Sequence, residues 1–154
     1  MNCDKKKAID LLEFSVIFTV FVLPPMCARS KSVLYTVPET ALQQFFFILK
    51  ICFLASFEEI LYRLYLPFRL KTVFVKIKRY RPAYFFITEL VPLFFFAAAH
   101  IYLGIASAVY AFFAGSLFRV LYVTLKMKIN KNAALISIIA LHTVNNAVVF
   151  AYIF

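Results

Sequence analysis

Two adjacent carboxylates, Glu58 and Glu59, lie inside an apolar stretch, and Arg63 follows one helical turn later. A charged side chain at the bilayer centre costs about 2.5–3.5 kcal/mol on insertion scales, so an intramembrane carboxylate is by default a functional-site hypothesis. In a helix Glu59 and Arg63 lie about 40° apart, whereas Glu58 and Arg63 lie about 140° apart. We therefore predict an ion pair between Glu59 and Arg63. Glu58, a desolvated carboxylate without that cation, is the candidate general base.

The only two histidines, His100 and His142, lie in or at the ends of apolar stretches. Phe96 precedes His100 by four residues, and Asn146 follows His142 by four. This spacing places both members of each pair on one helix face. A single histidine or asparagine in a membrane helix is commonly a hydrogen-bonding partner of a neighbouring helix. Together with the glutamates, in a chain so poor in polar residues, they favour a catalytic site.

The composition is that of a membrane protein. The chain has 154 residues, of which 64% are hydrophobic, and it contains 20 Phe. Soluble domains average about 45–50% apolar residues. The net charge of +10 lies in basic blocks between apolar runs, which favours contact with a lipid bilayer over nucleic acid. The three cysteines show no paired or metal-ligand spacing, and we predict no cofactor.

The length predicts a single membrane domain, residues 1–154. A membrane-spanning helix needs about 20 apolar residues. Several stretches meet this need, so we predict an all-α, polytopic membrane helix bundle. The connector 67–81 is basic with interspersed apolar residues and is expected on the membrane surface. The five predicted spans are residues 8–26, about 40–66, 82 to about 100–104, 105–125 and 133–154.

The basic residues predict the orientation. The segments expected on the inner side contain many basic residues: three in 5–7, six in 69–81 and three in 126–131. The segments expected on the outer side contain only Arg29 and Lys31. The positive-inside rule then gives an N-in, C-out, multi-pass protein of the cell membrane. We interpret the first span as a retained accessory helix rather than a signal peptide, because its end resembles no cleavage site.

With this orientation the depths of the polar residues can be compared. At 1.5 Å per residue, Glu58, His142 and His100 lie roughly 18, 15 and 24 Å from the inner ends of their helices. Tilt and side-chain length cover that spread, so we expect them to converge near the midplane. Arg119, in the fourth span, is expected to extend to the headgroups. Glu89 is expected at a helix start or as a partner of the basic connector.

The ordered set Glu58-Glu59-x-x-x-Arg63, Phe96-x-x-x-His100 and His142-x-x-x-Asn146 resembles the signature of the CPBP family of intramembrane glutamic proteases. These are the CAAX-protease and bacteriocin-processing, or Abi, proteins. The resemblance covers residues 40–154, which would form the catalytic core.

The resemblance implies hydrolysis of a peptide bond in a membrane-associated peptide or protein substrate. Glu58 and His100 would hold and activate the water, and His142 and Asn146 would donate to the oxyanion. Glu59 and Arg63 would form a supporting ion pair, and Phe96 would pack beside the site. The resemblance implies no metal. Relatives often have additional membrane helices. With five spans, this chain would need a homo-oligomer to enclose a water-filled cavity, or it would use a shallow, open site.

Other functions fit parts of the pattern. A membrane binding or bacteriocin self-immunity protein would keep the site without turnover. Two glutamates and two histidines could also ligate zinc in a zinc-dependent membrane protease. A transporter would use such residues too, but the chain shows no inverted repeat. Ser116 lacks the flanking glycine pattern of a rhomboid-like serine protease.

Overall fold

The computed structural model describes residues 13–14, 16–19, 38–75 and 80–153. These residues form helices and contain no strand, so the predicted all-α class is confirmed. Three helices, Arg81–Leu103, Ile105–Lys128 and Lys131–Ala151, are long and apolar enough to cross a membrane, and they correspond to the last three predicted spans. The predicted first span lies largely outside the described residues, and the five-span, N-in topology stays a prediction.

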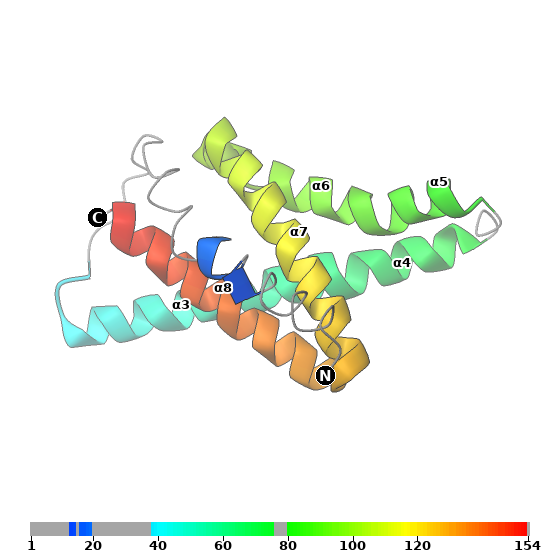
Figure 1. The fold of residues 1–154 in the computed structure, drawn as a ribbon. Helices are drawn as coiled ribbons and strands as arrows, with labels where there is room; N and C mark the ends of the chain where they lie inside the picture. The colour runs from blue at the N-terminus through cyan, green and yellow to red at the C-terminus, as the bar shows by residue number, and fades with distance from the viewer. Residues whose placement is uncertain (1–12, 15, 20–37, 76–79, 154) are drawn as a thin grey trace.

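One continuous helical segment contains both glutamates. It comprises α3 (Ala41–Glu59), the π-helical turn η2 (Ile60–Tyr65) and α4 (Leu66–Val73), which follow one another along one line (Figure 1). A capping box begins it, because Thr40 Oγ1 accepts from the Gln43 N–H while the Gln43 side chain accepts from the Thr40 N–H. These bonds satisfy two of the free N–H groups at the helix start.

The helical segment extends beyond the predicted end of the second span. Part of the connector predicted on the membrane surface is therefore the helix α4, which continues past Pro67 to Val73. Proline is tolerated here because it lies in the first turn after η2, where the hydrogen-bond ladder changes register. The first part of the predicted connector is thus helical, and its predicted place on the membrane surface stays a prediction.

A second continuous helical segment runs back beside the first (Figure 1). It comprises α5 (Arg81–Phe85), the π-helical turn η4 (Phe86–Leu90) and α6 (Val91–Ala98), and the 3₁₀ turn η5 (Ile101–Leu103) follows it. Pro82 lies in its first turn, the position at which the sequence predicts a helix start.

Two long helices complete the described part. Gly104 has φ of 108°, a conformation that L-residues with a side chain rarely adopt, and it separates the preceding turn from α7 (Ile105–Lys128). α8 (Lys131–Ile153) follows after a short break, where the Asn130 side chain accepts from the Ala133 N–H at 2.8 Å.

The helices pack as a bundle in which α8 contacts both α3 and α7, and α7 contacts α6. Phe118, Tyr122, Ala134 and Ile138 form a buried cluster between α7 and α8. Many large apolar side chains, such as Phe53 on α3, point outward, as expected for a surface covered by lipid. The polar residues considered next lie between these helices.

Candidate active site

A stripe of buried residues brings the first motif into the bundle. Ile51, Ala55, Glu59, Arg63 and Pro67 follow one another at intervals of four, and all are buried. Four residues of α-helix turn about 400°, so such a stripe drifts by about 40° per step. The π-helical turn η2 is wider than an α-helical turn, which reduces that drift. Arg63 and Pro67 therefore still face the other helices.

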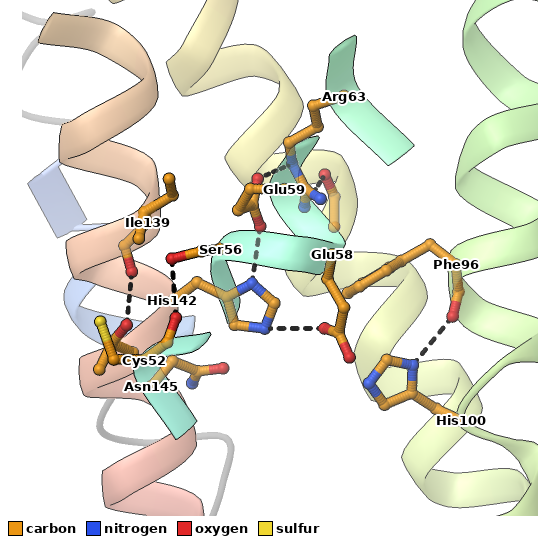
Figure 2. Close-up of polar contacts among 12 residues, drawn as sticks. Cys52, Ser56, Glu58, Glu59, Arg63, Phe96, His100, Ile139, His142 and Asn145 are labelled. Carbon is orange, nitrogen blue, oxygen red and sulfur yellow. Dashed lines mark hydrogen bonds and ion pairs between the residues drawn. The ribbon is translucent and has the colours of Figure 1, made fainter. Parts of the chain in front are cut away.

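A second stripe on α8 faces the first. Ala134, Ile138, His142 and Asn145 are buried at helical spacing. Since α8 packs against α3, His142 is placed directly opposite the glutamates. Figure 2 shows its imidazole ring between the carboxylates of Glu58 and Glu59.

Glu59 is completely buried and has two charged or chargeable partners. Its Oε2 lies 2.7 Å from Arg63 Nε, so the ion pair expected from the spacing forms, although the angles are not those of a hydrogen bond. Its Oε1 lies 2.6 Å from His142 Nδ1. Arg63, 4% exposed, also donates from Nη2 to the carbonyl of Gly115 at 3.4 Å.

Glu58 contacts the opposite nitrogen of the same histidine. Its Oε2 lies 3.4 Å from His142 Nε2, and its side chain is 25% exposed. This oxygen is buried and makes no hydrogen bond with the described part of the chain. His142 therefore contacts Glu59 as well as Glu58, in addition to the predicted Glu59–Arg63 pair. One imidazole lies between both carboxylates because each of its two nitrogens faces one of them.

His100 lies at the end of α6, next to Phe96. Its Nδ1 is 2.9 Å from the Phe96 carbonyl oxygen, and since a carbonyl only accepts, Nδ1 is the protonated nitrogen. Figure 2 shows the other nitrogen facing the carboxylate of Glu58. The Phe96 ring lies 4.8 Å from the ring of His100 and 6.0 Å from that of His142. The structure thus brings these side chains to the same place.

Phe96 also contacts the cation of the site. The Arg63 guanidinium carbon lies 5.0 Å from the Phe96 ring centroid and 5.6 Å from that of Phe118, within the range of cation–π attraction. Gly115 makes this packing possible. A Cβ on Gly115 would lie 2.8 Å from Phe96 Cδ1 and 2.9 Å from Leu93 Cδ1.

The two asparagines of α8 have different surroundings. Asn146 is half-buried and makes no hydrogen bond with the described residues. Asn145 is buried and donates to the Tyr110 hydroxyl, which itself donates to the Thr19 carbonyl at 3.1 Å. Sequence reasoning missed Asn145, although its place next to a motif residue in an apolar helix was a readable signal.

A second polar cluster lies next to this site. Arg119 donates to Glu89 from Nε at 2.8 Å and from Nη2 at 2.5 Å, and Lys71 Nζ lies 2.7 Å from Glu89 Oε1. The prediction that Arg119 extends to the headgroups is therefore wrong, because an acidic partner lies within reach inside the bundle. For Glu89, the expected alternative of a partner in the basic connector is confirmed by the Lys71 contact.

A small cavity separates the two polar clusters. Its volume is about 20 Å³, and Tyr62, Arg63, Glu89 and Arg119 are among its lining residues. A space of this size holds about one water molecule. The described residues contain no group of three or more His, Cys, Asp or Glu side chains arranged to hold a metal ion.

The fold and these contacts define a helical membrane protein with a carboxylate–imidazole cluster inside its bundle. The model of the family "Type II CAAX prenyl endopeptidase Rce1-like" matches residues 40–148, more than half of the chain. The chain belongs to this Rce1-like family of CAAX-type intramembrane proteases, and the resemblance to the CPBP proteases is confirmed. Comparisons with curated proteins and with solved structures gave no match.

Proposed function

We propose that the chain is an intramembrane endopeptidase in which Glu58 and His100 activate the water that hydrolyses a peptide bond. The observation that supports this most is the Glu58 carboxylate. Its Oε2 is buried and makes no hydrogen bond with the described residues. The carboxylate as a whole lies between the rings of His142 and His100 (Figure 2). An acceptor left free at such a place is suited to take a proton from water.

His142 lies between the two carboxylates of the site. Its Nδ1 is 2.6 Å from Glu59 Oε1, and its Nε2 is 3.4 Å from Glu58 Oε2. Glu59 therefore orients the ring, and Nε2 points to the side of Glu58 on which we place the water.

The same residues can then carry out hydrolysis. One O–H bond of the water breaks, its proton passes to Glu58, and the oxygen bonds to the scissile carbonyl carbon. The second hydrogen is held by Nε2 of His100, whose Nδ1–H is occupied by the Phe96 carbonyl. The C–N bond then breaks, and the proton on Glu58 passes to the leaving nitrogen.

Two donors stabilise the negative oxygen that forms on the substrate. His142 Nε2, which lies 3.4 Å from Glu58 Oε2, donates to this oxygen as Glu58 takes up the proton of the water. Asn146 contributes its amide, for which no partner competes among the described residues. A preorganised donor of this kind accounts for about 10²–10³ in rate. Glu59 and Arg63 orient His142 and do not react.

The test compares Glu58→Gln with wild type in detergent micelles. Its substrate is a fluorogenic peptide that ends in a farnesylated CAAX tetrapeptide, beside the same peptide without the prenyl group. We expect kcat to fall about 10²–10⁴-fold, the range for loss of an acid–base group, with the helical melting curve unchanged. Glu39→Gln, at an exposed glutamate before α3, is the matched control.

Three results would change the conclusion. Full activity of the Glu58→Gln variant contradicts the mechanism. Loss of wild-type cleavage on chelation, with recovery on adding zinc, identifies a zinc-dependent protease instead. Failure of the wild type to cleave any peptide of a broad membrane-tethered panel contradicts the enzyme and favours a binding or immunity protein.

A further inference from the structure

The second polar cluster is attached to the backbone of the first motif. Arg119 on α7 binds Glu89 on η4 through Nε and Nη2, and its remaining nitrogen, Nη1, donates to the backbone carbonyl of Arg63 at 3.0 Å. A single guanidinium therefore joins α7, η4 and η2. Its plane of donors is suited to two acceptors at once.

The carbonyl of Arg63 lies in the π-helical turn η2, where the hydrogen-bond ladder changes register. In this turn a carbonyl accepts from the N–H five residues later, as the Leu61 carbonyl does from Leu66. A carbonyl oxygen has two lone pairs. It can therefore accept from the Arg119 side chain in addition to a donor of its own helix.

The Arg119 hydrogen bond is made to Arg63, whose side chain belongs to the candidate active site. The side chain of Arg63 holds Glu59 at 2.7 Å, and Glu59 holds His142 at 2.6 Å. The small cavity lined by Arg63, Glu89 and Arg119 adjoins this bond. The Arg119 hydrogen bond therefore holds the Arg63 backbone at a place where side-chain packing is incomplete.

We propose that Arg119 is a positioning residue of the protease. It acts through the carbonyl of Arg63 to set the place of Glu59 and, through Glu59, of His142, while Glu89 holds the guanidinium in the required orientation. This inference rests on the proposed function and adds a residue that the three motifs do not contain. Arg119 touches neither water nor substrate.

The discriminating variants are Arg119→Lys and Lys71→Gln. A lysine keeps the positive charge beside Glu89 but presents a single ammonium, which does not reproduce the fork that spans two acceptors. Lys71→Gln removes the other cation bound to Glu89 and leaves the Arg63 carbonyl bond intact. The two variants thus separate the charge of the cluster from the hydrogen bond to η2.

On the farnesylated peptide we expect Arg119→Lys to lower kcat about 10–100-fold, the size of effect that a misplacement of about 1 Å produces. KM and the melting temperature are expected to stay near the wild-type values. Lys71→Gln should leave both kinetic constants unchanged. Wild-type kcat in Arg119→Lys, or an equal loss in Lys71→Gln, would overturn the proposal.

The ring ¹⁵N signals of the two histidines test the route without a substrate. Arg119→Lys should shift the signals of His142, because the Arg63 backbone, Glu59 and His142 are joined in series, whereas Lys71→Gln should leave them near the wild-type positions. Unchanged His142 signals in Arg119→Lys would contradict the route. This measurement needs no cleavage, so an inactive wild type would count against the proposed function alone.

Discussion

Substitution of Glu59 by glutamine should destabilise the protein strongly. Glu59 is completely buried, and its partner Arg63 is only 4% exposed, so the variant leaves a cation inside the bundle without its counter-charge. Breaking a buried ion pair on one side costs about 3–5 kcal/mol. The exposed pair of Lys71 and Glu89, with side chains 41% and 20% exposed, should contribute about 0–1 kcal/mol.

Far-UV circular dichroism during denaturant titration in micelles measures this difference, since the chain has no tryptophan to report unfolding by fluorescence. Glu59→Gln should lower the free energy of unfolding several times more than Lys71→Gln. The double variant Glu59→Gln/Arg63→Met removes both charges and should be more stable than Glu59→Gln alone. Equal stabilities of the two single variants, or a double variant less stable than Glu59→Gln, would refute the assignment of a buried ion pair.

Two further predictions concern the packing and the asparagines. Gly115→Ala places a methyl 2.8 Å from Phe96 Cδ1, and overpacking of this kind costs about 1–3 kcal/mol; unchanged unfolding and kcat would show that the ring has room to move. Asn145→Ala removes a buried amide bonded to the Tyr110 hydroxyl and should lower the melting temperature. Asn146→Ala should instead lower kcat with little effect on melting, and the opposite pattern would assign the oxyanion role to Asn145.

Features within one helix could be predicted from the sequence. The Glu59–Arg63 contact follows from a spacing of four residues on a helix, and it forms at 2.7 Å. The start of α3 at the Thr40 capping box and the start of α5, with Pro82 in its first turn, likewise depend on neighbouring residues. Such geometry is local, so it needs no knowledge of the other helices.

Contacts between helices were predicted less well. Glu58, Glu59, Phe96, His100 and His142 do lie near one another. The sharing of His142 by both glutamates and the Arg119–Glu89 pair were not anticipated. Each depends on how one helix is rotated about its axis relative to the next. In a soluble protein the apolar face of a helix would indicate that rotation.

In this chain, what the sequence by itself determined is the membrane composition, the helices and the pairs of residues that share a helix face. The tertiary structure decided which of these faces meet. The physical reason is that lipid and protein interior are similarly apolar, so the outward Phe53 and the inward Phe118 are the same residue type. Only the packed bundle, with its π-helical turns and Gly115, placed the two carboxylates around His142.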